Sequence, residues 1–299
     1  MIDAIDKRFF IGNTNKGGNE LYIINHHNAP DIMREIGRLR ERSFSASGGG
    51  TGKELDIDEL DTCENAYQQL IVYAPEDKEI IGGYRFINCQ TVLTQLKEGK
   101  AAISTAKYFN FSDQFIEHYL PHTIELGRSW IQPDYQPARN PRKGLFALDN
   151  LWDGLGAIVV DSPDIKYFFG KVTMYPNYNQ QARAALQAFM QHFFPDKDAL
   201  VRPKTPLIFE LTEEIEFLST IEQLSFKEAH KELQKFVRAR GEFIPPLINN
   251  YMQLSPTMKT FGTAHNKDFG EVQETGILIT IDDIYPEKKE RHLSQFINK

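Results

Sequence analysis

Alternating apolar and polar positions predict a series of strands along the chain. The clearest is the segment 123–131, where Ile124, Leu126 and Trp130 alternate with polar or small residues before Pro133 supplies a stop. Comparable patterns predict further strands at residues 20–25, 69–73, 79–88, 165–174 and 276–281. The strands at 69–73 and 79–88 are separated by a short turn and are expected to form a β-hairpin.

Apolar residues at helical spacing predict helices between these strands. They are expected at residues 32–44, 91–99, 145–160, 179–194, 226–240 and 247–254. Asp31 is expected to cap the first of them. A short apolar piece at 206–211 and the charged helix at 226–240 are expected to form a helical insertion or lid over residues 205–245. Since the sequence has no internal repeat and no clear linker, it predicts one mixed α/β domain covering residues 1–299.

Two charged residues interrupt the apolar segment 123–131. A charge in a buried strand costs several kcal/mol unless it is paired or used, so Glu125 and Arg128 require a role. A structural ion pair and a catalytic or substrate-binding role both remain open. Residues three apart on a regular strand point to opposite faces, so these two side chains can share a site only if the strand is bulged. Gly127 is a suitable residue for such a bulge.

A third charge is predicted inside the hairpin. Arg85 shares one face of its strand with Ile81, Gly83 and Ile87, and we therefore expect it to be buried and paired with a carboxylate. The candidates for that carboxylate are Asp58, Asp61 and Glu125.

Basic residues gather at two places. Arg139, Arg142 and Lys143 precede Gly144 and the helix expected at 145–160, and free amides at a helix start together with basic groups favour a phosphate. Arg34, Arg38 and Arg42 recur at four-residue spacing and form one basic helix face, which is either solvated or a second binding surface for an acidic partner. The glycine-rich residues 45–53 follow a helix and lack the Walker spacing, so we expect a mobile loop there and no nucleotide site.

Composition narrows the class of protein. The 299 residues are 41% hydrophobic and 25% charged, which is typical of a soluble globular protein, and the net charge of -7 argues against a dedicated nucleic-acid binder. Cys63 and Cys89 have no metal-site spacing and are too few for a disulfide framework. No apolar run approaches the length of a membrane span. We therefore expect a cytoplasmic protein without a bound metal.

Several short motifs in a particular order give the chain a family resemblance. They are Asp58-Glu-Leu-Asp61, Gly83-Tyr-Arg-Phe86, Glu125-Leu-Gly-Arg-Ser129, Asn150-Leu-Trp-Asp-Gly154, and Ile244-Pro-Pro-Leu-Ile-Asn-Asn-Tyr251 followed by Asp268-Phe-Gly270. This order, over about residues 20 to 285, resembles the "hemolysin-like" N-acyltransferases that make ornithine or glycine lipids, and it is similar to the acyl-homoserine-lactone synthases. The resemblance implies a GNAT-like fold, with a central mixed, mostly antiparallel sheet flanked by helices.

The resemblance also implies an activity. It implies transfer of a fatty acyl group, 3-hydroxylated in the family, from the phosphopantetheine thioester of acyl carrier protein to the amine of an amino acid, with no permanently bound cofactor. Acyl-CoA is the less expected donor, because Arg139 to Gly144 is only a degenerate form of the phosphate loop of acetyl-CoA-dependent relatives. Arg139, Arg142, Lys143 and Gly144 are then expected to meet the carrier protein and its phosphopantetheine. A peripheral contact with the inner membrane surface also remains open.

Aminolysis of a thioester requires a proton acceptor and groups that position the substrates. We assign Glu125 as the expected proton acceptor, and Arg85 and Arg128 as groups that hold the amino-acid carboxylate or fix Glu125. Asp58 and Asp61 are expected to contribute to the same site, and Trp152 either lines an acyl pocket or belongs to the core.

Three other functions remain open from the sequence alone. An acyl-homoserine-lactone synthase would use the same donor, and an acetyl-CoA-dependent N-acetyltransferase would use the same fold. The third is a non-enzymatic module that binds acyl carrier protein, because a fold does not guarantee a function.

Overall fold

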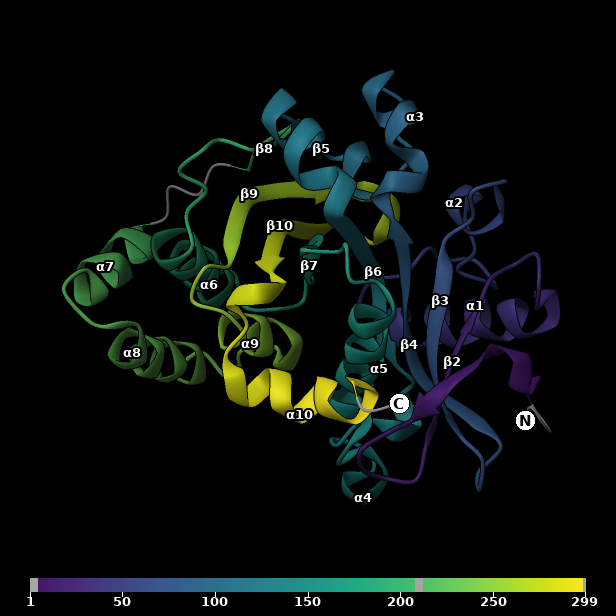
Figure 1. The fold of residues 1–299 in the computed structure, drawn as a ribbon. Coiled ribbons are helices and arrows are strands. Elements are labelled where there is room, and N and C mark those ends of the chain that lie inside the picture. Colours follow the sequence, from purple (N-terminus) through teal and green to yellow (C-terminus); the bar gives the residue numbers. More distant parts are fainter. Residues whose placement is uncertain (1–4, 208–211, 298–299) are drawn as a thin grey trace.

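The computed structural model describes residues 5–207 and 212–297, and these form one large sheet with helices on both faces (Figure 1). The strands are β1 (Phe10–Asn13), β2 (Glu20–Ile24), β3 (Gln68–Ala74), β4 (Glu79–Asn88), β5 (Phe109–Phe111), β6 (Thr123–Ile131), β7 (Tyr167–Met174), β8 (Val201–Pro203), β9 (Lys259–Asn266) and β10 (Val272–Thr280). Eight of them form the main sheet in the order β1-β2-β3-β4-β6-β7-β10-β9. Every neighbouring pair in it is antiparallel except β6 and β7, which are parallel.

The helices lie between and beside these strands. They are α1 (Pro30–Ser45), α2 (Glu59–Thr62), α3 (Leu93–Lys97), α4 (Pro141–Gly144), α5 (Ala147–Asp161), α6 (Gln180–Phe193), α7 (Thr212–Ile221), α8 (Phe226–Arg238), α9 (Pro246–Met252) and α10 (Pro286–Ile297). None of the helices within residues 5–207 and 212–297 is both long and apolar enough to cross a membrane.

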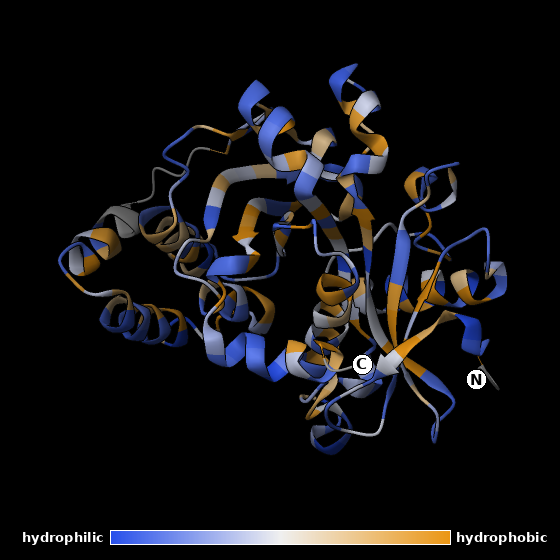
Figure 2. Cartoon of the chain, viewed as in Figure 1, coloured by the Kyte–Doolittle hydropathy of each residue, from blue (hydrophilic) through white to orange (hydrophobic). Residues whose placement is uncertain are grey.

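The alternation of side chains along the strands builds a core on each face of the sheet. On one face Leu126 and Val172 pack with residues of α5, α6, α8 and α9. On the other face α1 covers the β2 to β4 side, and residues 89–122 cover the β7 to β9 side. Figure 2 shows hydrophobic residues along the central strands and hydrophilic ones on much of α8 and α10. The sheet is therefore buried on both faces, and a charged residue in its middle must be paired or must face a cavity.

Several predicted elements differ in their limits. Pro30 occupies the first turn of α1 and Ala29 precedes the helix, so Asp31 lies inside the first turn and is not the cap. The helix expected at 145–160 is found as α5, and a separate short helix, α4, precedes it. β9 carries no strong alternation, and it was not predicted, although it pairs with β10 along the edge of the sheet. The predicted apolar piece at 206–211 falls largely on residues 208–211, which lie outside the described residues.

The segment predicted as an insertion contains α7 and α8. Ser225 and Glu228 form a capping box at the start of α8, and Leu233 and Val237 on its inner side are fully buried. These side chains belong to the same core as α5 and α6, so α8 packs firmly onto the domain. That the segment 205–245 acts as a lid stays a prediction.

Candidate active site

The candidate site begins where the two parallel strands separate. β6 and β7 pair only from Thr123 with Tyr167 to Leu126 with Gly170. A Cβ atom at position 170 would lie 2.5 Å from the carbonyl oxygen of Leu126, so glycine permits this last close contact between the strands. Beyond it the strands diverge and leave a space inside the sheet.

A bulge in β6 lies directly beyond this point. Gly83 of β4 pairs with Trp130 and Arg85 pairs with Gly127, so two residues of β6, Arg128 and Ser129, oppose the single residue Tyr84. The bulge that would allow Glu125 and Arg128 to share a site is therefore present, although Arg128 pairs with aspartates instead. The residue in the left-handed region is Arg128, with a φ of 46°, and not Gly127. A side chain in this region costs about 1–3 kcal/mol, so the contacts of Arg128 must hold it in place.

The space between the diverging strands is a cavity of about 600 Å³. Most of its lining is apolar or aromatic, and its residues include Tyr84, Leu126, Leu148, Phe168, Phe169, Val172, Leu247, Ile248, Tyr251, Ile277 and Ile279. The bulge residues Arg128 and Ser129 also line it, as does Gly144. An elongated apolar group with one polar end would match this lining.

Three arginines and three aspartates form a buried network beside the bulge: Arg40, Arg85 and Arg128 with Asp56, Asp58 and Asp61. Asp56 accepts hydrogen bonds from Nε of Arg128 at 2.7 Å and from its Nη2 at 3.0 Å, and another from Nε of Arg40 at 3.0 Å. Burial raises the pKa of Asp56, but the positive charges of Arg40 and Arg128 outweigh it and lower this pKa to about 2. Asp56 therefore remains ionised and anchors Arg128.

Arg85 pairs with two of the three carboxylates that the sequence predicted as its partners. Nη1 of Arg85 donates to Asp58 at 2.8 Å and to Asp61 at 3.2 Å, and the Arg85 side chain is almost completely buried. Asp61 also binds Arg40, whose fully buried guanidinium was not singled out in the sequence. Two of the predicted substrate-binding residues, Asp58 and Asp61, thus hold arginines in place, and neither lines the cavity.

Glu125 is fully buried and has different partners. It accepts hydrogen bonds from the backbone N–H of Thr105 at 2.7 Å and of Ser104 at 3.2 Å, and from the hydroxyl of Tyr67. Neither Arg85 nor Arg128 pairs with it within the described residues. Glu125 therefore fixes the turn at 104–105, and it lies outside the cavity lining. Its assignment as proton acceptor stays a prediction.

Tyr67 connects Glu125 to the arginine network. Cζ of Arg85 lies 4.9 Å from the centre of the Tyr67 ring, while the hydroxyl of Tyr67 faces Glu125. Burial, together with the negative charge of Glu125, raises the pKa of Tyr67 well above its usual value. The phenol therefore stays protonated and donates its hydrogen bond to Glu125.

Of the other predicted site residues, only Gly144 lines the cavity. Arg139 and Arg142 are exposed, and Nζ of Lys143 donates to Asp77 at 2.8 Å. Gly144 packs against the backbone of residues 136–137, where a Cβ atom would lie 2.5 Å from a backbone nitrogen. Trp152 lies in the core, with its ring 5.4 Å from that of Tyr251, so it supports a cavity residue without lining the cavity itself.

A buried ion pair that the sequence analysis missed faces the cavity. Nζ of Lys171 on β7 lies 2.7 Å from Oε1 of Glu274 on β10, and both residues line the space beyond Gly170. Cross-strand pairing places Gly276 opposite Lys171 and Glu274 opposite Thr173, so the two charges are diagonal neighbours on one face. A lysine inside the apolar run 167–174 was the available signal, since an unpaired charge there would be costly.

The surroundings of Lys171 weaken its positive charge. Burial lowers the pKa of Lys171, Glu274 opposes this effect, and the nearby guanidinium of Arg128 lowers the pKa further. Nζ also lies 5.3 Å from the centre of the Tyr108 ring. Nζ of Lys171 lies 2.7 Å from Oε2 of Glu274 as well as from Oε1, so the carboxylate faces a single ammonium group. The remaining lone pairs of Glu274 and the remaining N–H groups of Lys171 are available to a ligand in the cavity.

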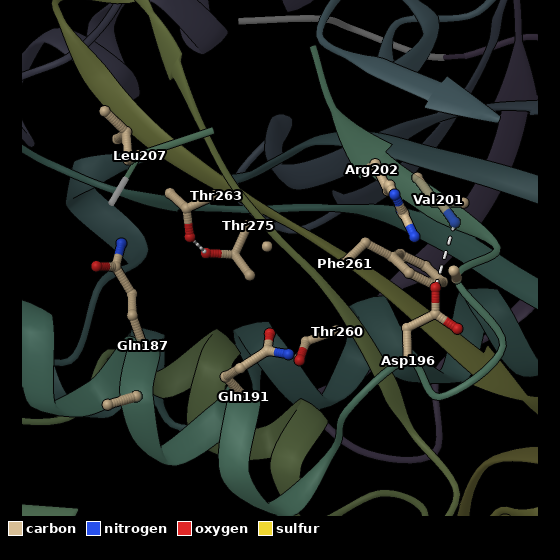
Figure 3. Close-up of a pocket in the computed structure, with 13 residues that line it drawn as sticks. Gln187, Gln191, Asp196, Val201, Arg202, Leu207, Thr260, Phe261, Thr263 and Thr275 are labelled. Carbon is tan, nitrogen blue, oxygen red and sulfur yellow. Dashed lines mark hydrogen bonds between the residues drawn. The ribbon is translucent and has the colours of Figure 1, made fainter. Parts of the chain in front are cut away.

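A second cavity of about 400 Å³ lies between α6 and the edge strand β9 (Figure 3). Its lining mixes polar and apolar residues, and the hydroxyls of Thr263 and Thr275 hydrogen-bond to each other at 2.8 Å on its wall. None of the predicted site residues lines it. The cavity between β6 and β7 is therefore the better candidate for the active site, because it combines apolar depth with the bulged strand and convergent charges.

Known proteins resemble this chain in sequence. Residues 39–143 match the acetyltransferase (GNAT) domain family. The chain is 53% identical over 284 residues to a glycine N(alpha)-acyltransferase of Bacteroides thetaiotaomicron, which covers 95% of this chain and 84% of that protein. It is 51% identical over 290 residues to a glycine N(alpha)-acyltransferase of Phocaeicola vulgatus, covering 96% of this chain and 87% of that protein.

Solved structures resemble the fold more distantly. The AHL synthase LasI is 12% identical, with a TM-score of 0.41, over 93% of this chain and 96% of its own. The CoA-dependent acyl-homoserine lactone synthase BjaI, with SAM and isopentyl-CoA, is 15% identical, with a TM-score of 0.32, over 56% of this chain and 72% of its own. The GNAT match and the mostly antiparallel sheet confirm the predicted fold class.

Proposed function

The chain belongs to the glycine N(alpha)-acyltransferase family, and we propose that it transfers a fatty acyl group from the thioester of acyl carrier protein to the amine of glycine. The family and the GNAT match make the protein an acyltransferase, as the sequence resemblance predicted. Glycine as acceptor rests on the relatives of about half identity over nearly the whole chain.

The single observation that carries the acyl part of the proposal is the cavity between β6 and β7. Its volume of about 600 Å³ and its lining by Phe168, Ile248, Ile277 and Ile279 suit a long apolar chain. Each buried methylene contributes about 0.8 kcal/mol, so such a lining favours a fatty acyl group over an acetyl group.

The bulge supports the chemical step. The extra residue of a bulge leaves the ladder locally unpaired, so backbone N–H groups near Arg128 and Ser129 can donate to the thioester oxygen. Donors held in place before the reaction stabilise negative charge as it develops on this oxygen in the transition state. The thioester carbon would then lie at the bulge, with the acyl chain extending into the cavity.

Charge supports the carrier protein as donor. Such a partner is acidic, and the exposed Arg139 and Arg142 are close in sequence to Gly144, which lines the cavity. Lys143 pairs with Asp77 at 2.8 Å, whereas Arg139 lies at a longer distance of 4.0 Å from Asp134, so Arg142 and Arg139 carry most of the proposed docking charge. The product of glycine acylation is amphiphilic, and we place the reaction at the start of aminolipid synthesis, in the cytoplasm and with peripheral access to the membrane.

The test is an assay of the purified chain with donors of matched acyl length. Palmitoyl and 3-hydroxypalmitoyl groups are supplied on acyl carrier protein or on coenzyme A, with glycine, ornithine or adenosylmethionine as acceptor, and the products are identified by mass spectrometry. We expect N-acylglycine, formed faster from the carrier protein. A lactone product would instead indicate an acyl-homoserine-lactone synthase, and turnover of acetyl-CoA alone would indicate an N-acetyltransferase.

A further inference from the structure

Three charged side chains, two cations and one carboxylate, line one part of the otherwise apolar cavity. Lys171 and Glu274 enter from β7 and β10, and Arg128 enters from the bulge of β6. The side chain of Glu274 is 2% exposed, that of Lys171 is 9% exposed and that of Arg128 is 12% exposed. Such burial is costly for charged groups unless a ligand or partner uses them.

We propose that Lys171, Glu274 and Arg128 form the subsite that binds the amino-acid acceptor, a small zwitterion with adjacent ammonium and carboxylate groups. This inference rests on the proposed function, and it assigns the acceptor end of the same cavity. Arg128 was singled out in the sequence, whereas Lys171 and Glu274 were not, and neither of these two belongs to the arginine network.

The ammonium group of the acceptor is matched by Glu274. Nζ of Lys171 lies 2.7 Å from both Oε1 and Oε2 of Glu274, so one ammonium group is shared by two buried carboxylate oxygens. An ionised carboxylate can accept about four hydrogen bonds, and this single contact leaves acceptor capacity on both oxygens. A second ammonium donor in the cavity would use that capacity through a charge-assisted hydrogen bond.

The carboxylate of the acceptor is matched by Lys171 and Arg128. An ammonium group has three N–H donors, and Lys171 uses one of them on Glu274. Arg128 binds Asp56 through Nε and Nη2, and its Nη1 makes no hydrogen bond to the residues that the structure describes. Both side chains can therefore donate to one further anion. Repulsion between these two cations falls when a carboxylate binds between them.

The reaction then proceeds with a definite proton balance. Glu274 accepts one proton from the glycine ammonium, and the neutral amine attacks the thioester carbon to form a C–N bond. The C–S bond breaks as the tetrahedral intermediate collapses. The second proton lost by the nitrogen passes to the departing thiolate, which leaves as the phosphopantetheine thiol, and Glu274 releases its proton to solvent.

The carboxylate of glycine also contributes to this step. When it binds Lys171, it competes with Glu274 for the ammonium group that pairs with Glu274 in the free protein. The acceptor thus needs its own carboxylate for efficient proton removal.

The first experiment compares glycine with glycinamide, which lacks the carboxylate, using the full chain and acyl carrier protein. Rates are corrected for the different pKa of the two amines. Loss of a charge-assisted hydrogen bond corresponds to a factor of about 10 to 100, so we expect kcat/KM for glycine to exceed that for glycinamide by at least tenfold. Equal values for the two acceptors would overturn the subsite.

Substitutions of Lys171 and Glu274 test whether these residues produce the preference for glycine and remove its proton. Lys171→Met should lower kcat/KM for glycine about tenfold more than kcat/KM for glycinamide, so that the preference for glycine is lost, and Lys171→Arg should restore the preference. A structural role alone would lower both acceptors equally, and that result would contradict the proposal. Glu274→Gln should lower kcat by about 10² to 10⁴, the usual contribution of a general base, with an unchanged KM for the donor.

Asp153→Asn is the matched control for Glu274→Gln. Asp153 is a buried carboxylate that pairs with His292 at 2.8 Å, and it does not line the cavity. This variant should keep the parent kcat to within about threefold. If Glu274→Gln retains activity as well, Glu274 is not the proton acceptor.

Different measurements test the proposed function and the proposed acceptor subsite, so either one can be rejected without the other. Formation of N-acylglycine by the parent tests the proposed function, whereas the preference for glycine over glycinamide tests the subsite. Calorimetric titration of the parent with glycine alone needs no variant and no donor. Glycine binding that glycinamide does not reproduce supports the subsite even where a variant fails to fold, and equal binding of both rejects it.

Discussion

Asp56 holds Arg128 by two hydrogen bonds, 2.7 Å from its Nε and 3.0 Å from its Nη2, at the residue where β6 bulges. Arg128 also lies against the ring of Phe269, with Cζ 4.3 Å from the ring centre. These contacts offset the cost of a left-handed arginine, because they fix both its charge and its side-chain direction. The bulge therefore depends on an aspartate 72 positions away in the chain.

Stability should fall in acid as Asp56 becomes protonated. Its pKa of about 2 in the folded protein is lower than the ordinary value near 3.9 of the unfolded chain. The stabilisation is therefore complete above about pH 4 and disappears as the pH falls towards 2. We expect this ion pairing of Asp56 to contribute about 2 kcal/mol to the free energy of unfolding. Urea titration at several pH values would measure its loss.

Asp56→Asn should make this pH dependence shallower and lower the free energy of unfolding at pH 7 by about 3–5 kcal/mol, because two buried arginines lose a charged partner. The control is Asp134→Asn, which removes the half-exposed partner of Arg42. A surface pair contributes at most about 1 kcal/mol. An equal loss in both variants would contradict the central role of Asp56.

Glu125→Gln tests the role predicted from the sequence against the observed contacts. An amide at this position presents N–H groups to the backbone donors of Ser104 and Thr105, so we expect a free energy of unfolding lower by about 1–3 kcal/mol. Because Glu125 does not line the cavity, kcat should fall by less than about tenfold. A loss of 10² or more with unchanged stability would instead support Glu125 as the proton acceptor.

Charge reversal at the cavity mouth tests the carrier-protein surface. Arg139→Glu with Arg142→Glu should raise KM for acyl carrier protein about tenfold or more and weaken its dependence on salt. Turnover of acyl-CoA in the same variant should change much less. Reversal of Arg34 and Arg38 on α1 is the matched control, and a larger effect there would move the docking surface to that helix.

A larger side chain in the cavity wall should shorten the preferred acyl chain. Ile248 is buried on α9 and lines the cavity, and Ile248→Trp would occupy part of its volume. One excluded methylene costs about 0.8 kcal/mol, or roughly fourfold in kcat/KM for each carbon beyond the new limit. Donors of six to sixteen carbons measure this, and the shortest one serves as the internal control. Equal loss for every length would show that the cavity does not hold the acyl chain.

Much of the fold followed from local pattern. The strand at 123–131 and the hairpin of β3 and β4 were predicted because side chains alternate with period two wherever one face of a strand is buried. Arg85 was expected to be buried and paired for the same reason. The edge strand β9 was missed because its residues Lys259–Asn266 alternate weakly, and its pairing with β10 decides its conformation.

The sequence by itself determined the family, most of the central strands, and the condition that Glu125 and Arg128 can share a site only if the strand is bulged. Only the tertiary structure decided which charges meet: Arg128 pairs with Asp56 and not Glu125, and Lys171 meets Glu274 from 103 positions away. The local pattern of apolar and polar residues indicates which positions are buried, because the burial of each position is reflected in the residue type found there. Pairing of charges and the divergence of β6 from β7 depend on strand register across the whole sheet, which no local pattern contains.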